Sequence, residues 1–480
     1  MLYRKAKEQI ESWLSDPKKA LLVSGARQVG KTWIIRECLK NSGYDYIEIN
    51  LIDDQDIKLL MEQSRTVDEL IIGLSAAKNH SFKKKETIIF IDEVQELPDI
   101  VTQIKFWVDE GSYHYILSGS LLGIELRSLR SAPVGYLREI KMFPLDFEEF
   151  LIASGVVADT FDYLRSSFEK MMPISNIVHD KMMQHFSRYL IIGGMPEAVS
   201  EYIETMDISR VSRIQGDIIE QYKLDFTKYE RIEKKLRLIS IFEQIPSQLM
   251  KQNRRFNYSD IQKGLRFERL EDSFLWLTYA GVSIPVYNTT EPRVALKQNT
   301  KSTLLKLYAS DVGLLTHQYG GTIRTKILTG DTSVNLGGIY ENAVAQELNA
   351  HGFSMFFYNS HKNGELDFLI EQDMSVVPIE VKSGKDYTIH SAMSKTVTNK
   401  EYEIKRAYVL SNYNVRQEGA ICYIPVYMAG FIKNEEEHII LEPIDNVNDA
   451  QKNRGHEAMK AVSKIASYNG ISDMTLDEIN

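Results

Sequence analysis

The sequence predicts a multi-domain α/β protein, and three observations lead to that prediction. The chain has 480 residues, which as a soft prior corresponds to about three domains of roughly 150 residues each. In the first part, short apolar runs alternate with amphipathic segments, a pattern typical of a parallel sheet covered by helices. A second group of short apolar runs follows one helical pattern beyond residue 331, which indicates a further compact α/β unit.

The composition restricts the classes of protein to which the chain can belong. Hydrophobic residues make up 43% of the chain and charged residues 26%, which is the balance of an ordinary globular protein. The formal net charge is -9, so no global positive field attracts nucleic acid, and any such contact needs a local patch. The two cysteines, Cys38 and Cys422, exclude a disulfide framework and suit a reducing compartment.

We expect a cytoplasmic protein without membrane contact. No stretch of the chain approaches the roughly 18 apolar residues that are needed to span a bilayer. Residues 1–5 are not followed by the apolar core of a signal peptide.

The N-terminal elements are expected to form the parallel sheet of a first domain, residues 1–142. Strands are expected over 19–24, 46–50, 86–91 and 113–118, and an amphipathic helix over 32–39. From about residue 143 the pattern becomes helical up to about residue 229. The sequence Gly193-Gly194-Met195-Pro196 interrupts this helical stretch, and we assign residues 143–230 to a helical lid.

The second half is expected to contain two further domains and an extension. Short helical patterns followed by apolar alternation around 282–287 and 304–308 suit a winged-helix-like module over 231–330. A linker around 331–337 leads to one helix, over 340–350, and to strands around 355–358, 366–370, 376–381, 406–410 and 422–426. These elements define an α/β domain over 331–440. The polar stretch 441–480 is expected to be a peripheral C-terminal extension.

The most specific motif lies directly after the first expected strand. It consists of Gly25, Ala26, Arg27, Gln28, Val29, Gly30, Lys31 and Thr32, and it matches the P-loop pattern G-x-x-x-x-G-K-[ST] in full. The glycines let backbone N–H groups face phosphates, and the following helix N-terminus adds a favourable dipole. Lys31 would then reach the β- and γ-phosphates of ATP, and the Thr32 hydroxyl would ligate Mg²⁺. The alternative is a chance match in which Gly25 and Gly30 only make turns.

The third expected strand ends in two carboxylates, Asp92 and Glu93. The continuous apolar run before them has the form of a buried parallel strand, which delivers acids to the carboxyl edge of the sheet. Asp92 would hold Mg²⁺ through water, and Glu93 would polarise the attacking water, which favours hydrolysis over storage of bound nucleotide. The alternative is an ordinary acidic pair at a helix N-terminus.

Further nucleotide contacts are expected after the fourth strand. Ser118 could hydrogen-bond the γ-phosphate or the lytic water, or it could simply end the strand in a turn. Arg127, Arg130 and Arg138 follow, and one of them could stabilise transition-state charge, within the chain or across a subunit boundary. The alternative for each is a solvated surface arginine. We include Ser118 and Arg138 among the expected nucleotide-binding residues.

These motifs resemble a known family. The P-loop string, the acidic strand, the turn at Ser118 and the segment 143–150 (FPLDFEEF) look like the AAA-like ATPases of bacteria and archaea that carry a C-terminal restriction-endonuclease-like domain. Segments 193–197 (GGMPE) and 307–314 (LYASDVGL) are similar to further signatures of that family. The resemblance runs from about Arg4 to about Val426. Many relatives place Gly-Arg or Gly-Lys just before the Pro-Leu segment, whereas Tyr136 follows Gly135 here, so the arginine finger stays unassigned.

A second set of charged residues lies on two successive expected strands. Asp367, Glu380 and Lys382 follow the pattern D…E-x-K. Glu380 and Lys382 are two residues apart and share a strand face. If the strands pair, Asp367 and Glu380 can hold Mg²⁺ with Lys382 beside a nucleophilic water, and Glu341 on the preceding helix could add a carboxylate. The alternative is a solvated strand face or a cross-strand ion pair.

Two functions therefore remain open. In the first, an ATPase controls a metal-dependent nuclease domain. In the second, the chain is a nucleotide-gated DNA- or protein-binding switch whose nuclease fold is inactive. The basic runs 251–256 and 263–266 could contact DNA phosphates or could be ordinary surface. A protein partner or a homo-oligomer is also possible.

Replacement of the P-loop lysine, Lys31→Ala, is expected to abolish tight ATP binding. The reason is that the ammonium group neutralises the charge of the β- and γ-phosphates. Calorimetric titration with ATP and Mg²⁺ measures the loss, and wild-type affinity in the variant would contradict the P-loop assignment.

Overall fold

The computed structural model describes residues 2–120, 135–228, 232–264, 266–331, 335–360 and 362–434. Nearly all of these residues belong to one compact unit that ends at Lys433. Arg127, Arg130 and the extension expected over 441–480 lie outside the described residues. Among the described helices, none combines the length and the apolar character that a membrane crossing requires.

The N-terminal half is built on a parallel sheet, as the sequence predicts. Its described strands are β1 (Ala20–Gly25), β2 (Asp45–Asn50), β3 (Thr87–Asp92), β4 (His114–Gly119) and β5 (Leu137–Met142), in the order β2-β3-β4-β1-β5. All neighbours in this sheet run parallel. The edge strand β5 was not anticipated, because charged residues at 138, 139 and 141 interrupt its apolar pattern.

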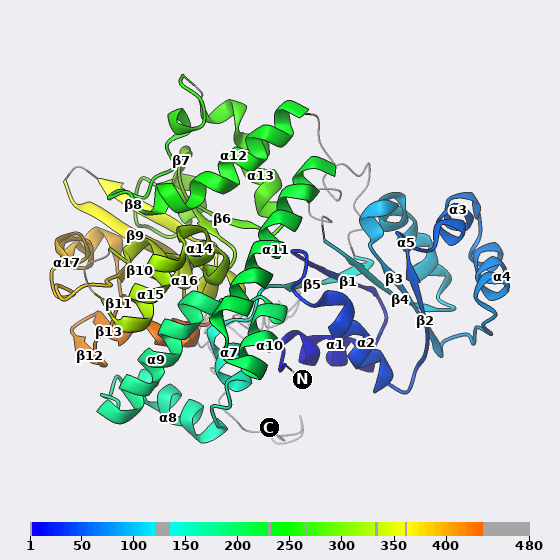
Figure 1. The fold of residues 1–480 in the computed structure, drawn as a ribbon, viewed down its shortest axis with the longest axis horizontal. Helices are drawn as coiled ribbons and strands as arrows, with labels where there is room; N and C mark the ends of the chain where they lie inside the picture. The colour runs from blue at the N-terminus through cyan, green and yellow to red at the C-terminus, as the bar shows by residue number, and fades with distance from the viewer. Residues whose placement is uncertain are drawn as a thin grey trace, which may run out of the picture. The chain divides into compact units, whose positions relative to one another are not determined.

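Helices cover both faces of this sheet (Figure 1). Alternate strand residues point to opposite faces, and the two hydrophobic clusters follow that rule: Leu21 and Val23 of β1 belong to one cluster, Ala20 and Leu22 to the other. The first cluster includes α1 (Ala6–Ser15) and α2 (Lys31–Lys40). The second includes α3 (Gln55–Gln63), α4 (Val67–Lys78) and α5 (Asp99–Glu110).

The middle of the chain is mainly helical. Its described helices are α7 (Phe147–Ala153), α8 (Ala158–Glu169), α9 (Asn176–Ile192), α10 (Pro196–Thr205), α11 (Ile208–Lys228), α12 (Ile232–Leu249), α13 (Glu271–Tyr279), α14 (Val312–Tyr319) and α15 (Gly321–Thr329). α7 begins at a capping box, in which the Asp146 side chain accepts from the Glu149 backbone N–H and Glu149 reaches back to Asp146. The expected interruption at Gly193 separates α9 from α10.

A mixed sheet forms the C-terminal part. Its described strands are β6 (Ser283–Thr289), β7 (Thr300–Ala309), β8 (Phe356–Ser360), β9 (Gly364–Gln372), β10 (Ser375–Val381), β11 (Ala407–Ser411), β12 (Arg416–Glu418) and β13 (Ile421–Pro425), in the order β12-β13-β11-β10-β9-β8-β6-β7. The remaining helices of this part are α16 (Gly337–Ala350) and α17 (Ser391–Thr398). Short 3-10 turns are η1 (Val94–Glu96), η2 (Tyr258–Asp260), η3 (Phe267–Arg269), η4 (Leu296–Asn299), η5 (Lys400–Tyr402) and η6 (Val426–Phe431).

The ribbon β6–β7 differs from its expected place. The sequence pattern predicts a separate winged-helix-like module for this ribbon, but β6 pairs in parallel with β8, so the ribbon forms one edge of the C-terminal sheet. The physical reason is that an apolar ribbon stabilises itself by joining a larger sheet, since an isolated hairpin is marginal in water. Main-chain hydrogen bonds therefore cross the boundary expected near residue 331.

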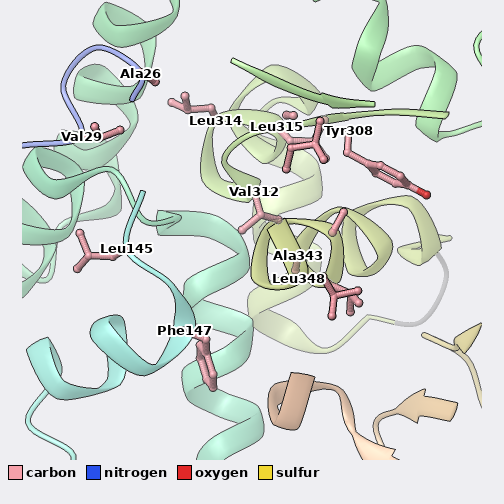
Figure 2. Close-up of a cluster of buried hydrophobic side chains, with 14 of the residues drawn as sticks. Ala26, Val29, Leu145, Phe147, Tyr308, Val312, Leu314, Leu315, Ala343 and Leu348 are labelled. Carbon is pink, nitrogen blue, oxygen red and sulfur yellow. The ribbon is translucent and has the colours of Figure 1, made fainter. Parts of the chain in front are cut away.

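One hydrophobic core continues from the P-loop to the C-terminal helix α16. Figure 2 shows side chains of this cluster, among them Ala26 and Val29 of the P-loop, Val312 of α14 and Leu348 of α16. All four are buried. The two halves of the chain are thus stabilised by shared apolar burial.

Two signatures noted in the sequence meet in a buried joint. The Gly194 N–H donates to the Asp311 carboxylate at 2.6 Å, and the Leu145 N–H donates to the Gly194 carbonyl at 2.6 Å. A Cβ on Gly194 would lie 2.0 Å from the Leu145 carbonyl oxygen, and one on Gly313 would lie 2.4 Å from the Ile192 carbonyl oxygen. The segments 193–197 and 307–314 therefore need glycines because backbones touch there.

Substitution of Gly194 by alanine is expected to lower the free energy of unfolding by about 3 kcal/mol, because the added methyl group overlaps a backbone oxygen that cannot move freely. The midpoint of urea unfolding measures the change. Gly321→Ala is the matched control, since a Cβ at Gly321 meets nothing within 4 Å. Equal midpoints for the two variants would contradict this account.

Candidate functional site

The P-loop joins β1 to α2 and has the strained backbone that its glycines permit. Gly25 has φ 143 and Gly30 has φ 90, and Gly30 is the N-cap residue of α2. A Cβ on Gly25 would lie 2.3 Å from the Met142 carbonyl oxygen of β5. Both glycines are therefore required by the local geometry, and the loop ends at a helix N-terminus suited to phosphate.

Lys31 closes the loop on itself. Its Nζ donates to the carbonyl oxygens of Gly25 at 3.0 Å and Ala26 at 2.8 Å. Burial lowers the pKa of Lys31 to about 8, although the carboxylates of Glu93 and Asp92 act in the opposite direction. A phosphate that takes the place of these carbonyl oxygens would give the ammonium a charged partner.

Asp92 connects three of the expected site residues at the carboxyl edge of the sheet. It accepts hydrogen bonds from the Thr32 hydroxyl at 2.8 Å, from the Ser118 hydroxyl, and from the Glu93 backbone N–H at 3.0 Å. Asp92 is 3% exposed. Parallel strands β3 and β4 and the helix α2 bring these groups together, as the order of motifs in the sequence predicts.

Glu93 lies next to this group in a left-handed backbone conformation, with φ 57. Such a conformation is uncommon for a residue other than glycine, asparagine or aspartate and is often found at functional sites. The Gln95 side-chain amide contacts the Glu93 carboxylate, which positions the carboxylate beside the Asp92 group.

Two residues that the sequence analysis missed hold the P-loop from outside. Arg4 donates to the Val29 carbonyl at 2.7 Å and to the Phe143 carbonyl at 2.6 Å. Asp225 of α11 forms an ion pair with Arg27 at 2.8 Å. A buried arginine so near the start of the chain has no distinctive motif around it, so no sequence signal marked Arg4.

Arg138 does not reach the loop. It is exposed on β5 and is in register with Leu21, four residues before the end of β1, which corresponds to about 13 Å along the strand. Lys141 is the basic residue of β5 beside the loop end, in register with Ser24. Arg138 therefore lies away from the loop in this conformation, and its contact with the nucleotide stays a prediction.

Two cavities flank the P-loop. One, of about 430 Å³, is lined by Leu2, Arg4, Gly30, Trp33, Pro196, Glu197, Ser200, Ile203 and Glu204. The other, of about 400 Å³, is lined by the loop, by Ser120, by β5 and by the segment that leads into β6. In that segment, a Cβ on Gly281 would lie 3.0 Å from the Ala26 backbone nitrogen, so the loop and the second sheet are in close contact.

The D…E-x-K residues lie together in the second sheet with an unexpected neighbour. Asp367 accepts from the Val381 N–H at 2.9 Å, and Lys382 pairs with Glu380 at 2.6 Å. Lys306 of β7, which is fully buried, places its Nζ 2.9 Å from Glu365, 3.5 Å from Asp367 and 3.7 Å from Glu341. We call Glu341, Glu365, Asp367 and Glu380 the acidic cluster.

Lys306 stays charged in this surrounding. Burial alone would lower the pKa of Lys306, but the carboxylates of Glu341, Asp367 and Glu365 outweigh burial and raise the pKa. The sequence does carry a signal for it: one lysine between the leucines at 305 and 307 in an expected strand. Lysine is almost never fully buried unless it is paired.

The basic run at 251–256 turns inward instead of forming a free patch. Lys251 pairs with Asp260, Arg254 pairs with Glu341, and Arg255 pairs with Glu365 at 2.8 Å. These ion pairs give the three basic residues carboxylate partners in this structure, and phosphate contact at 251–256 stays a prediction. Lys263 and Arg266 are exposed.

Within the described residues, one group of three side chains has metal-ligand spacing. Ligand atoms of Asp146, Glu347 and His351 lie within 4.8 Å of one another. Lysines already occupy the surroundings: Lys5 pairs with Asp146 at 2.5 Å, and Lys433 contacts His351 Nε2 at 3.1 Å. The Phe147 N–H donates to Glu347 at 2.6 Å. This group is therefore a charge-balanced joint between α7 and α16.

Comparisons with known proteins agree with the P-loop. A family model described as an AAA domain matches residues 17–151, and two models described as domains of unknown function match residues 183–323 and 336–428. The chain thus contains an AAA-type P-loop ATPase domain. No curated protein matches the chain.

Two solved structures are similar to the chain at low identity. The Walker-type ATPase PABY2304 of Pyrococcus abyssi is 17% identical, with 66% of this chain and 96% of that chain covered and a TM-score of 0.39. PCH-2 of C. elegans is 12% identical, with 43% of this chain and 65% of that chain covered and a TM-score of 0.25.

Glu347 predicts a pH dependence of stability. Burial and the nearby Asp146 raise the pKa of Glu347 from 4.5 to about 8, so the folded state favours the protonated form. Its contribution to stability is full below the unfolded pKa and is lost as pH rises, with the loss complete above the folded pKa. The melting temperature of the wild type is expected to fall between about pH 5 and pH 8, and Glu347→Gln is expected to flatten that fall. Scanning fluorimetry measures both, with exposed Glu169→Gln as control; equal slopes in all three proteins would contradict the assignment.

Proposed function

We propose that this chain, as an AAA-domain protein, binds ATP with Mg²⁺ at the P-loop and hydrolyses it. The observation that carries the proposal is the hydrogen-bonded group around Asp92, which joins Thr32, Ser118 and the backbone of Glu93 at the carboxyl edge of the parallel sheet. A hydroxyl and a carboxylate in contact form a donor set that suits Mg²⁺. The group therefore fits the ion that ATP brings.

Each residue of the P-loop site has its own role in this proposal. The loop N–H groups and the α2 N-terminus bind the phosphates, and Lys31 leaves its own carbonyl partners to neutralise the β- and γ-phosphate charge. Thr32 and Asp92 would hold the ion, which when bound neutralises the charge that develops on the phosphate oxygens. Glu93 orients and polarises the attacking water, and Ser118 holds Asp92 in place.

The cavity beside Gly30 and Trp33 supports a place for the adenine base. Trp33 directly follows the Mg²⁺-binding Thr32 and is 45% exposed. Leu2 and Pro196 line the same cavity, so an aromatic base would lie between apolar groups. Aromatic rings pack well in such sites. Base binding there would bring α10 of the helical lid into contact with the nucleotide.

A second candidate function concerns the C-terminal part. We infer a restriction-endonuclease-like fold for the described residues between 335 and 434 together with the ribbon β6–β7, from the D…E-x-K residues and the mixed sheet. The ion pairs around the acidic cluster favour the switch over the nuclease, because each of its carboxylates already has a cationic partner. In this proposal, nucleotide state changes how the C-terminal part binds DNA or a protein partner.

Substitution of Glu93 by glutamine is expected to preserve ATP binding and to slow hydrolysis by roughly 10²-fold or more, because only water activation is lost. Phosphate release under saturating ATP measures the rate, and calorimetry measures the affinity. Asp99→Asn, an exposed acid in the first turn of α5, is the control. Turnover unchanged in Glu93→Gln would remove Glu93 from the mechanism.

A further inference from the structure

We propose that Lys306 is a built-in cation that fills the acidic cluster and keeps divalent metal out of it. The proposal rests on the nuclease-like fold proposed above and concerns the regulation of that same site. In D…E-x-K nucleases the carboxylates hold a metal ion; here the chain itself supplies the positive charge.

The Lys306 ammonium occupies the space that a metal ion would need. Its ammonium lies within 4 Å of carboxylates of Glu341, Glu365 and Asp367, and its side chain is 0% exposed. A divalent ion would need to approach the same carboxylate oxygens to about 2.0–2.6 Å. The ammonium and the ion cannot share that space, because like charges at such distances repel strongly in a buried site.

The charges of the acidic cluster are balanced by cations of the same chain. Four carboxylates of the acidic cluster face four cations of the chain: Lys306, Lys382, Arg254 and Arg255. Only Lys382 belongs to the D…E-x-K pattern. The other three come from the loop after α12 and from β7, which lie in the segment matched by a separate family model. The middle segment thus neutralises a site that belongs to the following one.

The elements that carry these cations are fixed to α16 by hydrogen bonds and close packing. Asn342 of α16 bonds both the N–H and the carbonyl of Ala309 in β7, at 2.7 and 3.0 Å, and the Tyr308 hydroxyl donates to Glu341 at 2.9 Å. A Cβ on Gly337 would lie 2.2 Å from Arg254 Nη2. The start of α16 therefore has space for the arginine only because residue 337 is glycine.

One acceptor in the cluster remains available. Within the described residues, the buried Oε2 of Glu380 has no hydrogen-bond partner, while Oε1 is bound by Lys382. Asp367 lies on the neighbouring strand of the pair β9–β10. If Lys306 loses its charge, these oxygens are the ligands that a hard divalent cation prefers.

The test compares Mn²⁺ binding to the full chain, without nucleotide, in the wild type and in Lys306→Met. Methionine keeps most of the side-chain volume and removes the charge. We expect no saturable Mn²⁺ binding that depends on Asp367 in the wild type. In Lys306→Met we expect one Mn²⁺ per chain by electron paramagnetic resonance and a melting temperature that Mn²⁺ raises by several degrees. Both effects should vanish in the double variant Lys306→Met with Asp367→Asn.

Controls separate this site from others. Lys301→Met changes an exposed lysine of the same strand and should behave like the wild type, and any Mn²⁺ signal that survives Asp367→Asn belongs elsewhere, such as at Thr32 and Asp92. Asp367-dependent binding in the wild type equal to that of Lys306→Met would overturn the proposal, as would a folded Lys306→Met that binds no Mn²⁺.

A second variant keeps the test decisive if Lys306→Met does not fold. Lys306→Gln also removes the charge, keeps a polar end that can hydrogen-bond Glu365, and should show the same Asp367-dependent Mn²⁺ binding; the absence of that binding in the folded variant would overturn the proposal. A nuclease assay of Lys306→Met with Mn²⁺ is read separately. Metal binding without cleavage would contradict a latent nuclease activity while leaving the role of Lys306 intact.

Discussion

Burial of charge is the constraint on which the arrangement of this molecule depends. A charged group removed from water needs an opposite charge or several hydrogen bonds, because the desolvation cost otherwise exceeds what a fold can supply. Lys31, Asp92, Lys306 and Glu341 are all buried, and each finds its partners on another element. The contacts between elements are therefore specified by charge pairing as well as by apolar packing.

This constraint explains why the described residues up to Lys433 form one compact unit. Asp311 accepts a hydrogen bond from the Gly194 N–H, and Glu347 accepts one from the Phe147 N–H. Residues of the C-terminal half therefore anchor segments of the helical middle. The shared hydrophobic core runs through the same joints. Removing one segment would leave buried acceptors unpaired in another, which is costly.

Much of the nucleotide site could be predicted from the sequence, because each motif is local. A P-loop needs its glycines, lysine and threonine within eight positions, and the acids at 92 and 93 follow directly from an apolar strand. The structure places Thr32, Asp92 and Ser118 in contact, with both hydroxyls donating to Asp92, a contact that the motifs alone do not predict. The place of Arg138 could not be predicted, because it depends on the register of an edge strand that the sequence pattern does not reveal.

The second site could be predicted only in part, for the same reason. The spacing of Asp367, Glu380 and Lys382 indicates a shared surface, and strands β9 and β10 do pair. The pattern does not contain Lys306, which lies on a strand about sixty residues earlier in the sequence. Partners that are distant in the sequence are only weakly indicated by it, here by one lysine in an apolar strand. The basic residues at 254 and 255 resemble surface residues in the sequence, because their carboxylate partners are also distant.

The close approach of Gly281 to Ala26 has a mechanical consequence. The P-loop carbonyls at residues 25 and 26 hold Lys31 in the present conformation, so a loop that releases the lysine must readjust beside Gly281. A cavity of about 400 Å³ lies beside this contact, so a readjustment of the loop reaches the start of β6 where Gly281 touches Ala26. β6 pairs along its length with β7, the strand of Lys306. The contact between Gly281 and Ala26 is therefore a direct point of contact between the P-loop and the segment that leads into the second sheet.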